Sequence, residues 1–291
     1  MIIDIHTHIF PRFIRNERER FFRGECAFEL LYRNPHSKMA GWNDLIANMD
    51  EENIYRSVIF GFPWNDPDLY KRHNDYIMEA VQRNPERLIG FCCLNPLSGQ
   101  GPSEAERCLS EGLAGVGELA IYDSGFSDGI IGAMSDLMAV CCRFNVPVLF
   151  HTNEPVGHEY PGKQPIELHQ IYNLLKAYPL NKIILAHWGG GLFFYALMKK
   201  EVKDIFTHTW FDTAASPYLY SPDIYKIASS IVGPEKILFG SDFPLIRPGR
   251  YLKEMEGADL STEAFRKITG ENAAAMLNIE VGKSPQNKPK R

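Results

Sequence analysis

The sequence predicts a TIM-type (β/α)8 barrel, in which eight parallel strands alternate with eight helices. Two observations carry this prediction: short, almost continuously apolar runs recur eight times, and a helix-like segment follows each of them. Near-continuous apolar runs are typical of parallel strands that are covered on both faces. Because the first run leads directly into His6-Thr7-His8 without a glycine-rich turn, we prefer a closed barrel to an open, doubly wound sheet.

The order of the elements supports the barrel. The apolar runs are residues 2–6, 57–62, 88–94, 116–121, 146–151, 183–187, 205–213 and 237–240. The segments with helical spacing of apolar residues are 43–53, 75–83, 102–111, 128–144, 165–177, 192–201, 222–232 and 262–278. Eight such units in series close a barrel with right-handed crossovers. We therefore predict one domain over residues 1–279, and a flexible polar tail over 280–291.

The stretch from residue 11 to residue 41 departs from this pattern, because it is long, charged and rich in aromatic residues. It follows the first predicted strand, and active sites of such barrels lie at the carboxyl ends of the strands. Loops of this length in compact domains are commonly functional. We expect the stretch to cover the mouth of the catalytic site.

Composition and charge narrow the functional classes. Apolar residues make up 45% and charged residues 23% of the 291 residues, which is ordinary for a globular protein. The net charge is −5 and no long Lys/Arg run occurs, so we expect neither a nucleic-acid nor a membrane partner. Asp4 and His6 interrupt the opening apolar residues, so no signal peptide is expected. We read the six cysteines as buried free thiols in a cytoplasmic protein, and leave a homo-oligomer open.

Metal-competent side chains lie at the ends of several predicted strands. His6 and His8 are two residues apart, so strand alternation turns both imidazoles to the same face. Alone, each such residue has an ordinary structural explanation, such as a helix cap or a salt-bridge partner. The joint pattern points to a metal site, because the strand assignment brings the carboxyl ends together. The residues concerned are His6, His8, Glu118, His151, His187 and Asp242. The histidines at 36 and 73 are expected at the surface.

Four motifs resemble those of the amidohydrolase superfamily, and within it the "amidohydrolase 2" branch of metal-dependent hydrolases. They are Ile3-Asp-Ile-His-Thr-His8, Ile184-Leu-Ala-His-Trp-Gly-Gly-Gly191, Leu238-Phe-Gly-Ser-Asp-Phe-Pro244 and Gly270-Glu-Asn-Ala273. The first motif alone is weak evidence, but all four in this order are a strong signal. The resemblance covers residues 1 to about 279.

The resemblance implies roles for the strand-end residues. His6, His8 and His151 would bind a divalent metal, with Asp242 as a further ligand and proton acceptor. His187 would bind a second metal or act catalytically near the first. Glu118 resembles the carboxylate that bridges two metals in TatD-like hydrolases; alternatively, it orients one of the histidines. Zinc is the expected ion, in one or two copies.

The expected reaction is hydrolysis of a small-molecule ester, lactone, amide or related bond, because Zn²⁺ makes a hydroxide nucleophile of its bound water at neutral pH. Asp242 would carry the proton to the leaving group, with His187 as the other catalytic residue. The alternative is a non-oxidative decarboxylase of an aromatic or unsaturated acid, since the same branch contains such enzymes.

Substrate contacts are expected from the loops that follow His151 and Asp242. Donor side chains in these loops are candidates for substrate binding, and bidentate pairing with a substrate carboxylate would suit the arginine. They are His158, Tyr160, Lys163 and Arg247. For Lys163 and Arg247 the alternative is that they face solvent or bridge neighbouring loops. Four aromatic residues after strand ends are candidates for the walls of an apolar pocket, or equally for packing between loops: Trp64, Trp188, Trp210 and Phe211.

Overall fold

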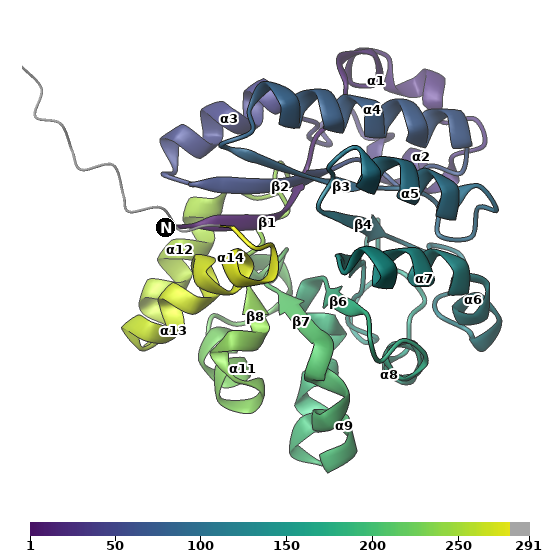
Figure 1. Ribbon diagram of the computed structural model, residues 1–291. Coiled ribbons are helices and arrows are strands. Elements are labelled where there is room, and N and C mark those ends of the chain that lie inside the picture. The colour runs from purple at the N-terminus through teal and green to yellow at the C-terminus, as the bar shows by residue number, and fades with distance from the viewer. Residues whose placement is uncertain (280–291) are drawn as a thin grey trace, which may run out of the picture.

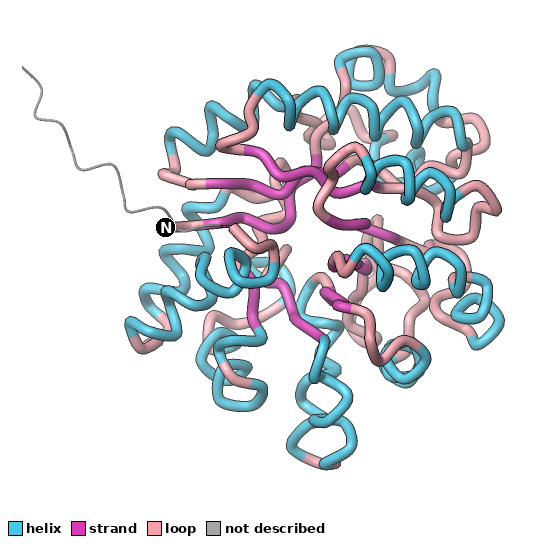
Figure 2. The backbone as a smooth tube through the Cα atoms, in the orientation of Figure 1, coloured by secondary structure: helices cyan, strands magenta, loops and turns pink. Residues whose placement is uncertain are grey.

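The computed structural model describes residues 1–279, and the tail predicted at 280–291 lies outside the described residues. Eight parallel strands follow one another around one sheet in the order of the sequence. They are β1 (Ile3–His8), β2 (Arg56–Phe60), β3 (Leu88–Cys92), β4 (Gly115–Leu119), β5 (Pro147–Phe150), β6 (Lys182–Leu185), β7 (Thr209–Asp212) and β8 (Ile237–Leu238). Figure 2 shows the strands gathered at the centre of the molecule, with the helices arranged around them.

The sheet returns to its first strand just after β8. The backbone N–H of Ile5 donates to the carbonyl of Phe239 at 2.9 Å, and that of Asp242 donates to the carbonyl of His6 at 2.9 Å. Thr7 also forms a parallel bridge with Phe243. Because these contacts join the last strand to the first, few backbone groups are left at open edges. The predicted TIM-type barrel is confirmed.

Helices surround the barrel (Figure 1). They include α3 (Trp42–Glu51), α4 (Pro67–Arg83), α5 (Gly101–Ser110), α6 (Asp128–Ala133), α7 (Ser135–Phe144), α8 (Leu168–Ala177), α9 (Lys200–Ile205), α11 (Ile224–Val232), α12 (Pro248–Gly257) and α13 (Thr262–Arg266). The stretch after β1 contains the short elements α1 (Arg12–Asn16), η1 (Arg18–Phe21) and α2 (Cys26–Tyr32), and α10 (Ser216–Leu219) follows β7. The remaining 3-10 turns are η3 (Phe206–His208) and η4 (Pro234–Lys236).

The barrel has two apolar cores, one between strands and helices and one inside the ring of strands. The inner core includes Ile3, Ile5 and Leu238 from the first and last strands. After the π-helical turn η5 (Lys267–Glu271), the helix α14 (Asn272–Met276) adds Ala273, Ala274 and Met276 to this inner core. In Figure 1, α14 lies in front of the strands and close to β1. The C-terminal helix therefore fills the amino end of the barrel, and the carboxyl end is left for the site.

The segment after β6 differs from the helix predicted at 192–201. The structure has 3-10 turns over η2 (His187–Leu197), and Trp188 and the three following glycines all have positive φ angles. Such angles are readily adopted only by glycine. A Cβ atom at Gly190 would lie 2.3 Å from the carbonyl oxygen of Asn153, so the glycine run also permits a close approach. The regular helix α9 comes later and takes the first residue of the predicted strand 205–213, and β7 begins at Thr209.

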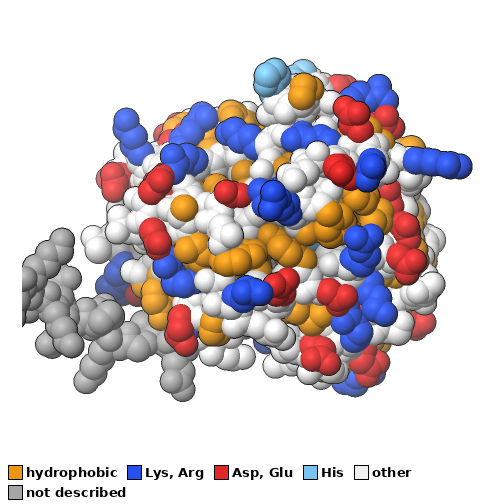
Figure 3. Space-filling view, turned by 90° about the horizontal axis from the view of Figure 1, so that it is seen from above, with side chains coloured by type: hydrophobic (Ala, Val, Ile, Leu, Met, Phe, Trp, Pro, Cys, Tyr) orange, Lys and Arg blue, Asp and Glu red, His pale blue; other side chains and the backbone are white. Residues whose placement is uncertain are grey.

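The surface shows no dominant charge on the face drawn in Figure 3, where Lys and Arg side chains alternate with Asp and Glu among the described residues. All six cysteines are free thiols; four are buried as predicted, whereas Cys26 and Cys142 are exposed. Over residues 1–279, no helix combines the length and the apolar character needed to cross a bilayer.

Candidate active site

The six strand-end side chains predicted as metal ligands meet at the carboxyl end of the barrel. His6 and His8 lie in β1 and Glu118 in β4. His151 follows β5 directly, and His187 is the first residue of η2, just after β6. Asp242 comes four residues after the end of β8. The barrel thus brings residues 236 positions apart in the chain to one place.

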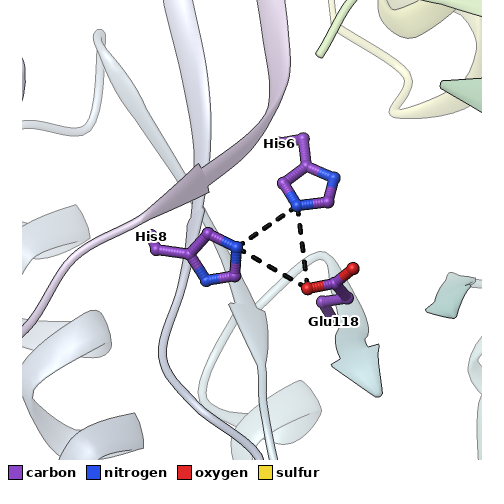
Figure 4. A group of neighbouring side chains, drawn as sticks. All are labelled: His6, His8 and Glu118. Carbon is purple, nitrogen blue, oxygen red and sulfur yellow. Dashed lines mark hydrogen bonds and ion pairs between the residues drawn. The ribbon is translucent and has the colours of Figure 1, made fainter. Parts of the chain in front are cut away.

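The ligand atoms of these side chains are only a few ångströms apart. His6 Nε2 lies 3.2 Å from His8 Nε2, and the two nitrogens lie 3.7 and 3.3 Å from Asp242 Oδ1. Glu118 Oε2 lies 3.7 Å from His6 Nε2 and 3.6 Å from His8 Nε2, as Figure 4 shows. Its other oxygen, Oε1, lies 2.9 Å from His151 Nδ1 and 3.6 Å from His187 Nε2. The carboxylate of Glu118 therefore faces histidines on both sides.

Three of the histidines have their other ring nitrogen bonded to a fixed acceptor. His6 Nδ1 lies 2.8 Å from Asp212 Oδ2, His187 Nδ1 lies 3.0 Å from the carbonyl of Ala214, and His8 Nδ1 lies 3.3 Å from the carbonyl of Gly61. Carbonyl and carboxylate oxygens accept hydrogen bonds, so each Nδ1 carries the proton and donates it. In its neutral form, each ring would present the lone pair of Nε2 toward the centre. Three such lone pairs close together favour a cation between them.

His151 is held differently from the other histidines. Its Nδ1 faces Glu118 Oε1 and lies 3.3 Å from His187 Nε2, whereas its Nε2 is buried and has no hydrogen-bond partner. Buried polar atoms without partners are uncommon in proteins. The Nε2 atom of His151 is therefore free to bind a further group beside the cluster.

The carboxylates make the electrostatic potential of the centre strongly negative. Burial alone would lower the pKa of His6, but the adjacent Asp212 and Glu118 raise it to about 10. Burial alone would raise the pKa of Glu118, yet His6 and His151 hold it well below its ordinary value. The pKa of Asp242 is lowered in the same way, against burial, by His8 and His6. A buried centre with ionised carboxylates needs positive charge.

The donor set fits a divalent metal ion. Four imidazoles and two carboxylates converge, and subsets of three ligand atoms lie within 4.8 Å of one another. Imidazole and carboxylate donors without thiolate suit Zn²⁺, Mn²⁺ and related ions. These six residues could therefore hold the metal that the sequence predicts.

Asp212 is a functional candidate that the sequence reasoning missed. One of its oxygens accepts from His6 Nδ1, and the other accepts from the backbone N–H groups of His187 and Ala214, each at 2.9 Å. It is fully buried and ends β7. The criterion that selected the other residues, a polar side chain at the carboxyl end of a strand, applies to Asp212 as well.

A cavity of about 680 Å³ opens above the cluster. His8, Glu118, His151, His187 and Asp242 form its floor. Its walls are largely apolar and aromatic, and include Leu31, Tyr32, Phe62, Tyr122, Tyr218 and Leu245. Leu31 and Tyr32 belong to the stretch after β1, which lies over the mouth of the site as expected.

The aromatic wall predicted from the sequence is different. Trp64, Trp188 and Phe211 are fully buried in the outer core, and Trp210 packs against the inner core. None of the four lines this cavity. His73, expected at the surface, is also buried, with 1% of its surface exposed. Its Nε2 lies 2.7 Å from the carbonyl of Ile9, and Trp64 Nε1 donates to its Nδ1 at 3.0 Å.

The four predicted substrate-binding residues fall into two groups. His158 and Tyr160 line the cavity. Lys163 and Arg247 are absent from its lining. The ammonium of Lys163 donates to carbonyls of its own loop, and the guanidinium of Arg247 forms ion pairs with Glu51 and Glu52 on the outside. Both cations therefore already have partners: Lys163 within its own loop, and Arg247 with Glu51 and Glu52 outside the cavity.

Curated relatives of the chain are decarboxylases. A 2-amino-3-carboxymuconate-6-semialdehyde decarboxylase of Dictyostelium discoideum is 21% identical and matches 97% of this chain and 92% of its own length. The gamma-resorcylate decarboxylases of Rhodococcus jostii and Polaromonas are 24% and 25% identical, and match 73% and 72% of this chain and 77% and 76% of their own lengths. The expectation of hydrolysis is therefore wrong: these relatives break a carbon–carbon bond.

Solved structures show the same fold. The 5-carboxyvanillate decarboxylase of Novosphingobium aromaticivorans, determined with bound manganese, has a TM-score of 0.76 at 15% identity and covers 96% of this chain and 97% of its own. A dihydroxybenzoic acid decarboxylase of Polaromonas, also with bound manganese, has a TM-score of 0.67 at 19% identity, covering 95% and 96%.

The family follows from a match along nearly the whole described chain. The amidohydrolase family model (Amidohydro_2) matches residues 3–279, which include every residue of the metal cluster. The barrel, the convergent donor set and the motif order agree with this match. The chain belongs to the amidohydrolase family.

Proposed function

We propose that this protein is a metal-dependent, non-oxidative decarboxylase that acts on an aromatic or unsaturated carboxylic acid. The observation that carries the proposal is the decarboxylase activity in the names of the three curated relatives, one of which aligns with 97% of this chain. The cavity supports it, because an apolar and aromatic wall above a metal-competent floor suits a flat acid bound through its carboxylate end.

The reaction breaks the bond between the carboxylate carbon and the adjacent carbon. Carbon dioxide leaves, the bonding electron pair stays on the adjacent carbon, and a proton takes its place there. A divalent metal bound at the centre supplies a positive charge that holds and polarises the acid. We assign the proton transfer to Asp242 and His187, which both line the cavity floor. The apolar wall excludes water and so strengthens electrostatic interactions at the floor.

The proposed metal ligands are those predicted from the sequence: His6, His8, Glu118, His151, His187 and Asp242. Two ions bridged by Glu118 remain a prediction, which its position between two pairs of histidines supports. Metal analysis tests it: two equivalents per chain would support the bridge. One equivalent would mean that Glu118 serves instead to orient His151, to which it is hydrogen-bonded at 2.9 Å.

Zinc is our first choice of ion. Imidazole-rich sites bind Zn²⁺ more tightly than Mn²⁺ under the general order of metal affinities. Manganese is the alternative, because the two structural neighbours described above hold it. Elemental analysis of the purified protein, followed by activity after reloading with each ion, distinguishes them.

The function is tested with a panel of acids. Metal-loaded protein is mixed with hydroxybenzoates, methoxy-substituted hydroxybenzoates and unsaturated dicarboxylic acids, and released carbon dioxide is measured together with the change in ultraviolet absorbance. We expect release from at least one acid and loss of that release after chelation. Full metal occupancy with no carbon dioxide from any acid, while esters or lactones are cleaved, would overturn the proposal.

A further inference from the structure

The loop between β5 and α8 forms a large part of the cavity wall. Its lining residues include Glu154, Val156, His158, Tyr160 and Gly162. Glu154 comes three residues after His151, so the loop stands directly beside the proposed metal centre. Whatever shapes this loop also shapes the space in which a substrate would lie.

Lys163 fixes the shape of the loop. Its side chain is only 6% exposed, and its ammonium donates to the carbonyl oxygens of Val156, Gly157 and His158 at 3.2, 3.3 and 3.3 Å. An ammonium has three N–H donors, and here they are used by the loop itself. Lys163 therefore does not offer its charge to a substrate, and instead holds the loop against the cavity.

Glu154 is a carboxylate in the cavity wall that keeps unused acceptor capacity. Its Oε2 accepts from the hydroxyl of Tyr160 at 3.0 Å, and its Oε1 lies 3.5 Å from the Lys163 ammonium. Burial and the adjacent Glu154 raise the pKa of Tyr160, so the phenol stays protonated and donates. A carboxylate offers about four acceptor sites, so two partners leave room for another donor.

Few charged groups accompany Glu154 in this wall. Above the floor, the formally charged residues among the described lining are Glu154 and Lys38. Lys38 is exposed at the rim, where its ammonium donates to the carbonyl of Leu245 at 3.0 Å. Much of the remaining wall is apolar or aromatic. A bound acid whose carboxylate faces the metal would therefore find, in the wall, a fixed anionic acceptor.

We propose that Glu154 determines substrate specificity: it selects acids that carry a neutral hydrogen-bond donor, such as a phenolic hydroxyl or an amino group, and rejects acids with a second carboxylate. This inference rests on the proposed function, since it takes the metal centre as the place where the first carboxylate binds.

The physical reason is that the Glu154 carboxylate attracts a hydrogen-bond donor and repels a second carboxylate, in a wall that is otherwise largely apolar. A hydroxyl or amino group that donates to Glu154 forms a hydrogen bond to a charged acceptor, which is stronger than one to a neutral acceptor. A second carboxylate at that place would lose its hydration and meet a like charge. The Lys163 ammonium, 3.5 Å from Glu154 Oε1, could not bond it in exchange, because its three N–H groups donate to carbonyls of the loop. Specificity of this kind depends on repulsion of the wrong ligand as well as attraction of the right one.

Binding measurements test the proposal without requiring turnover. The probes are benzoate, the positional isomers of hydroxybenzoate and the benzenedicarboxylates, titrated calorimetrically into metal-loaded protein at low temperature. The variants are Glu154→Gln and, as a matched control, Glu159→Gln. Glu159 belongs to the same loop, but its side chain is 87% exposed and 4.0 Å from the Lys163 ammonium.

In the unmodified protein, we expect the best hydroxybenzoate to bind roughly 10- to 100-fold more tightly than benzoate, the factor expected of one hydrogen bond to a charged group. Dicarboxylates should bind more weakly than benzoate. Glu154→Gln should reduce the first preference and relieve the rejection of dicarboxylates, and Glu159→Gln should change neither. Unchanged preferences in Glu154→Gln, or equal changes in both variants, would overturn the inference.

The outcomes separate this inference from the proposed function. If acids bind with the expected preferences and none releases carbon dioxide, the assignment of Glu154 stands and the decarboxylase proposal fails. If acids are decarboxylated and Glu154→Gln keeps the original preferences, the decarboxylase proposal stands and the assignment of Glu154 fails.

Discussion

At the floor of the cavity, the side chains project from strand ends, and most of them are held by a second group behind them. The part of the cavity wall that loops form is its roof. The side chains there come from loops whose shape depends on contacts made elsewhere. His187 illustrates the floor: it is buried, and the carbonyl of Ala214 accepts from its Nδ1 at 3.0 Å. Glu154 illustrates the roof, because the loop that carries it is held by Lys163.

This difference teaches where chemistry and specificity reside in the molecule. Changes at the floor should act on the metal and the reaction, whereas changes at the roof should act on the choice of substrate. Sites on rigid elements are positioned more precisely than sites on loops. The following predictions test whether floor and roof separate in this way.

The largest effect is expected when the β1 histidines are removed. The double variant His6→Ala/His8→Ala should lose the metal and all turnover, because two converging nitrogen ligands disappear. Metal content is measured by elemental analysis after dialysis, with the exposed His36→Ala as control. Full metal occupancy in the double variant would refute the assignment of the floor.

The second prediction separates metal binding from reaction. Asp242→Asn should keep most of the metal, because the other ligands remain, and should lower turnover by roughly 100- to 10,000-fold, the range typical of a lost proton-transfer group. Metal content and carbon dioxide release are measured on the same preparation. Near-normal turnover would show that Asp242 does not move the proton.

The floor could be read from the sequence because the position of a strand end dictates where its side chain lies. The pair His6 and His8 needs only strand alternation, and His151 and His187 need only the ends of their apolar runs. Glu118 depended on the register of its strand, which turns the side chain inward, where it is 5% exposed. Asp212 satisfies the same rule, and was missed because no motif drew attention to it.

The roof could not be read in this way, because loops have no periodicity that places their side chains. Arg247 and Lys163 look alike in the sequence as cations near the site, but each is already paired within the structure. The polar sequence around His73 predicts an exposed side chain, yet His73 is buried against Ile9, Phe10 and Trp64. Such outcomes depend on contacts between segments far apart in the chain.

Asp212 should affect metal binding through His6, whose ring it holds. Asp212→Asn should weaken metal binding by roughly 10- to 100-fold, the usual effect of removing a group that orients a metal-binding histidine. Competition titration with a metal indicator measures the affinity. Asp136→Asn, on the outer helix α7, is the control. An unchanged affinity would mean that packing alone holds the His6 ring.

His73 lies in α4 and bonds to the carbonyl of Ile9, just after β1, and its burial leads to a prediction about pH. Burial lowers its pKa from the ordinary 6.5 to about 4, against the hydrogen bond of its Nε2 to the carbonyl of Ile9, which raises the pKa. Between pH 6.5 and pH 4, His73 is therefore protonated in the unfolded chain and neutral in the folded chain. Stability should fall as the pH drops from 7 to 4.5, by about 2 kcal/mol from this residue.

Urea unfolding at both pH values, with a chelator present throughout, measures this contribution. His73→Gln should be less stable at pH 7, because packing and hydrogen bonds change, but it should lose about 2 kcal/mol less on acidification than the unmodified chain. The metal-binding histidines contribute equally to both proteins and cancel in the difference. Parallel losses in the two proteins would show that another group controls the acid sensitivity.

The smallest effect is expected at Arg247, which lies near the roof in sequence but outside it in space. Its guanidinium pairs with Glu51, and its Nε lies 3.3 Å from Glu52 Oε1, at an exposed position. Exposed ion pairs contribute about 0.2–1 kcal/mol to stability, because water and salt screen them. Arg247→Ala should therefore lower the free energy of unfolding by no more than that, and should leave kcat/KM within about twofold. If Arg247 instead bound the substrate carboxylate, Arg247→Ala would raise KM many-fold while the free energy of unfolding changed little. Comparing the change in KM with the change in the free energy of unfolding therefore decides whether Arg247 contacts the substrate.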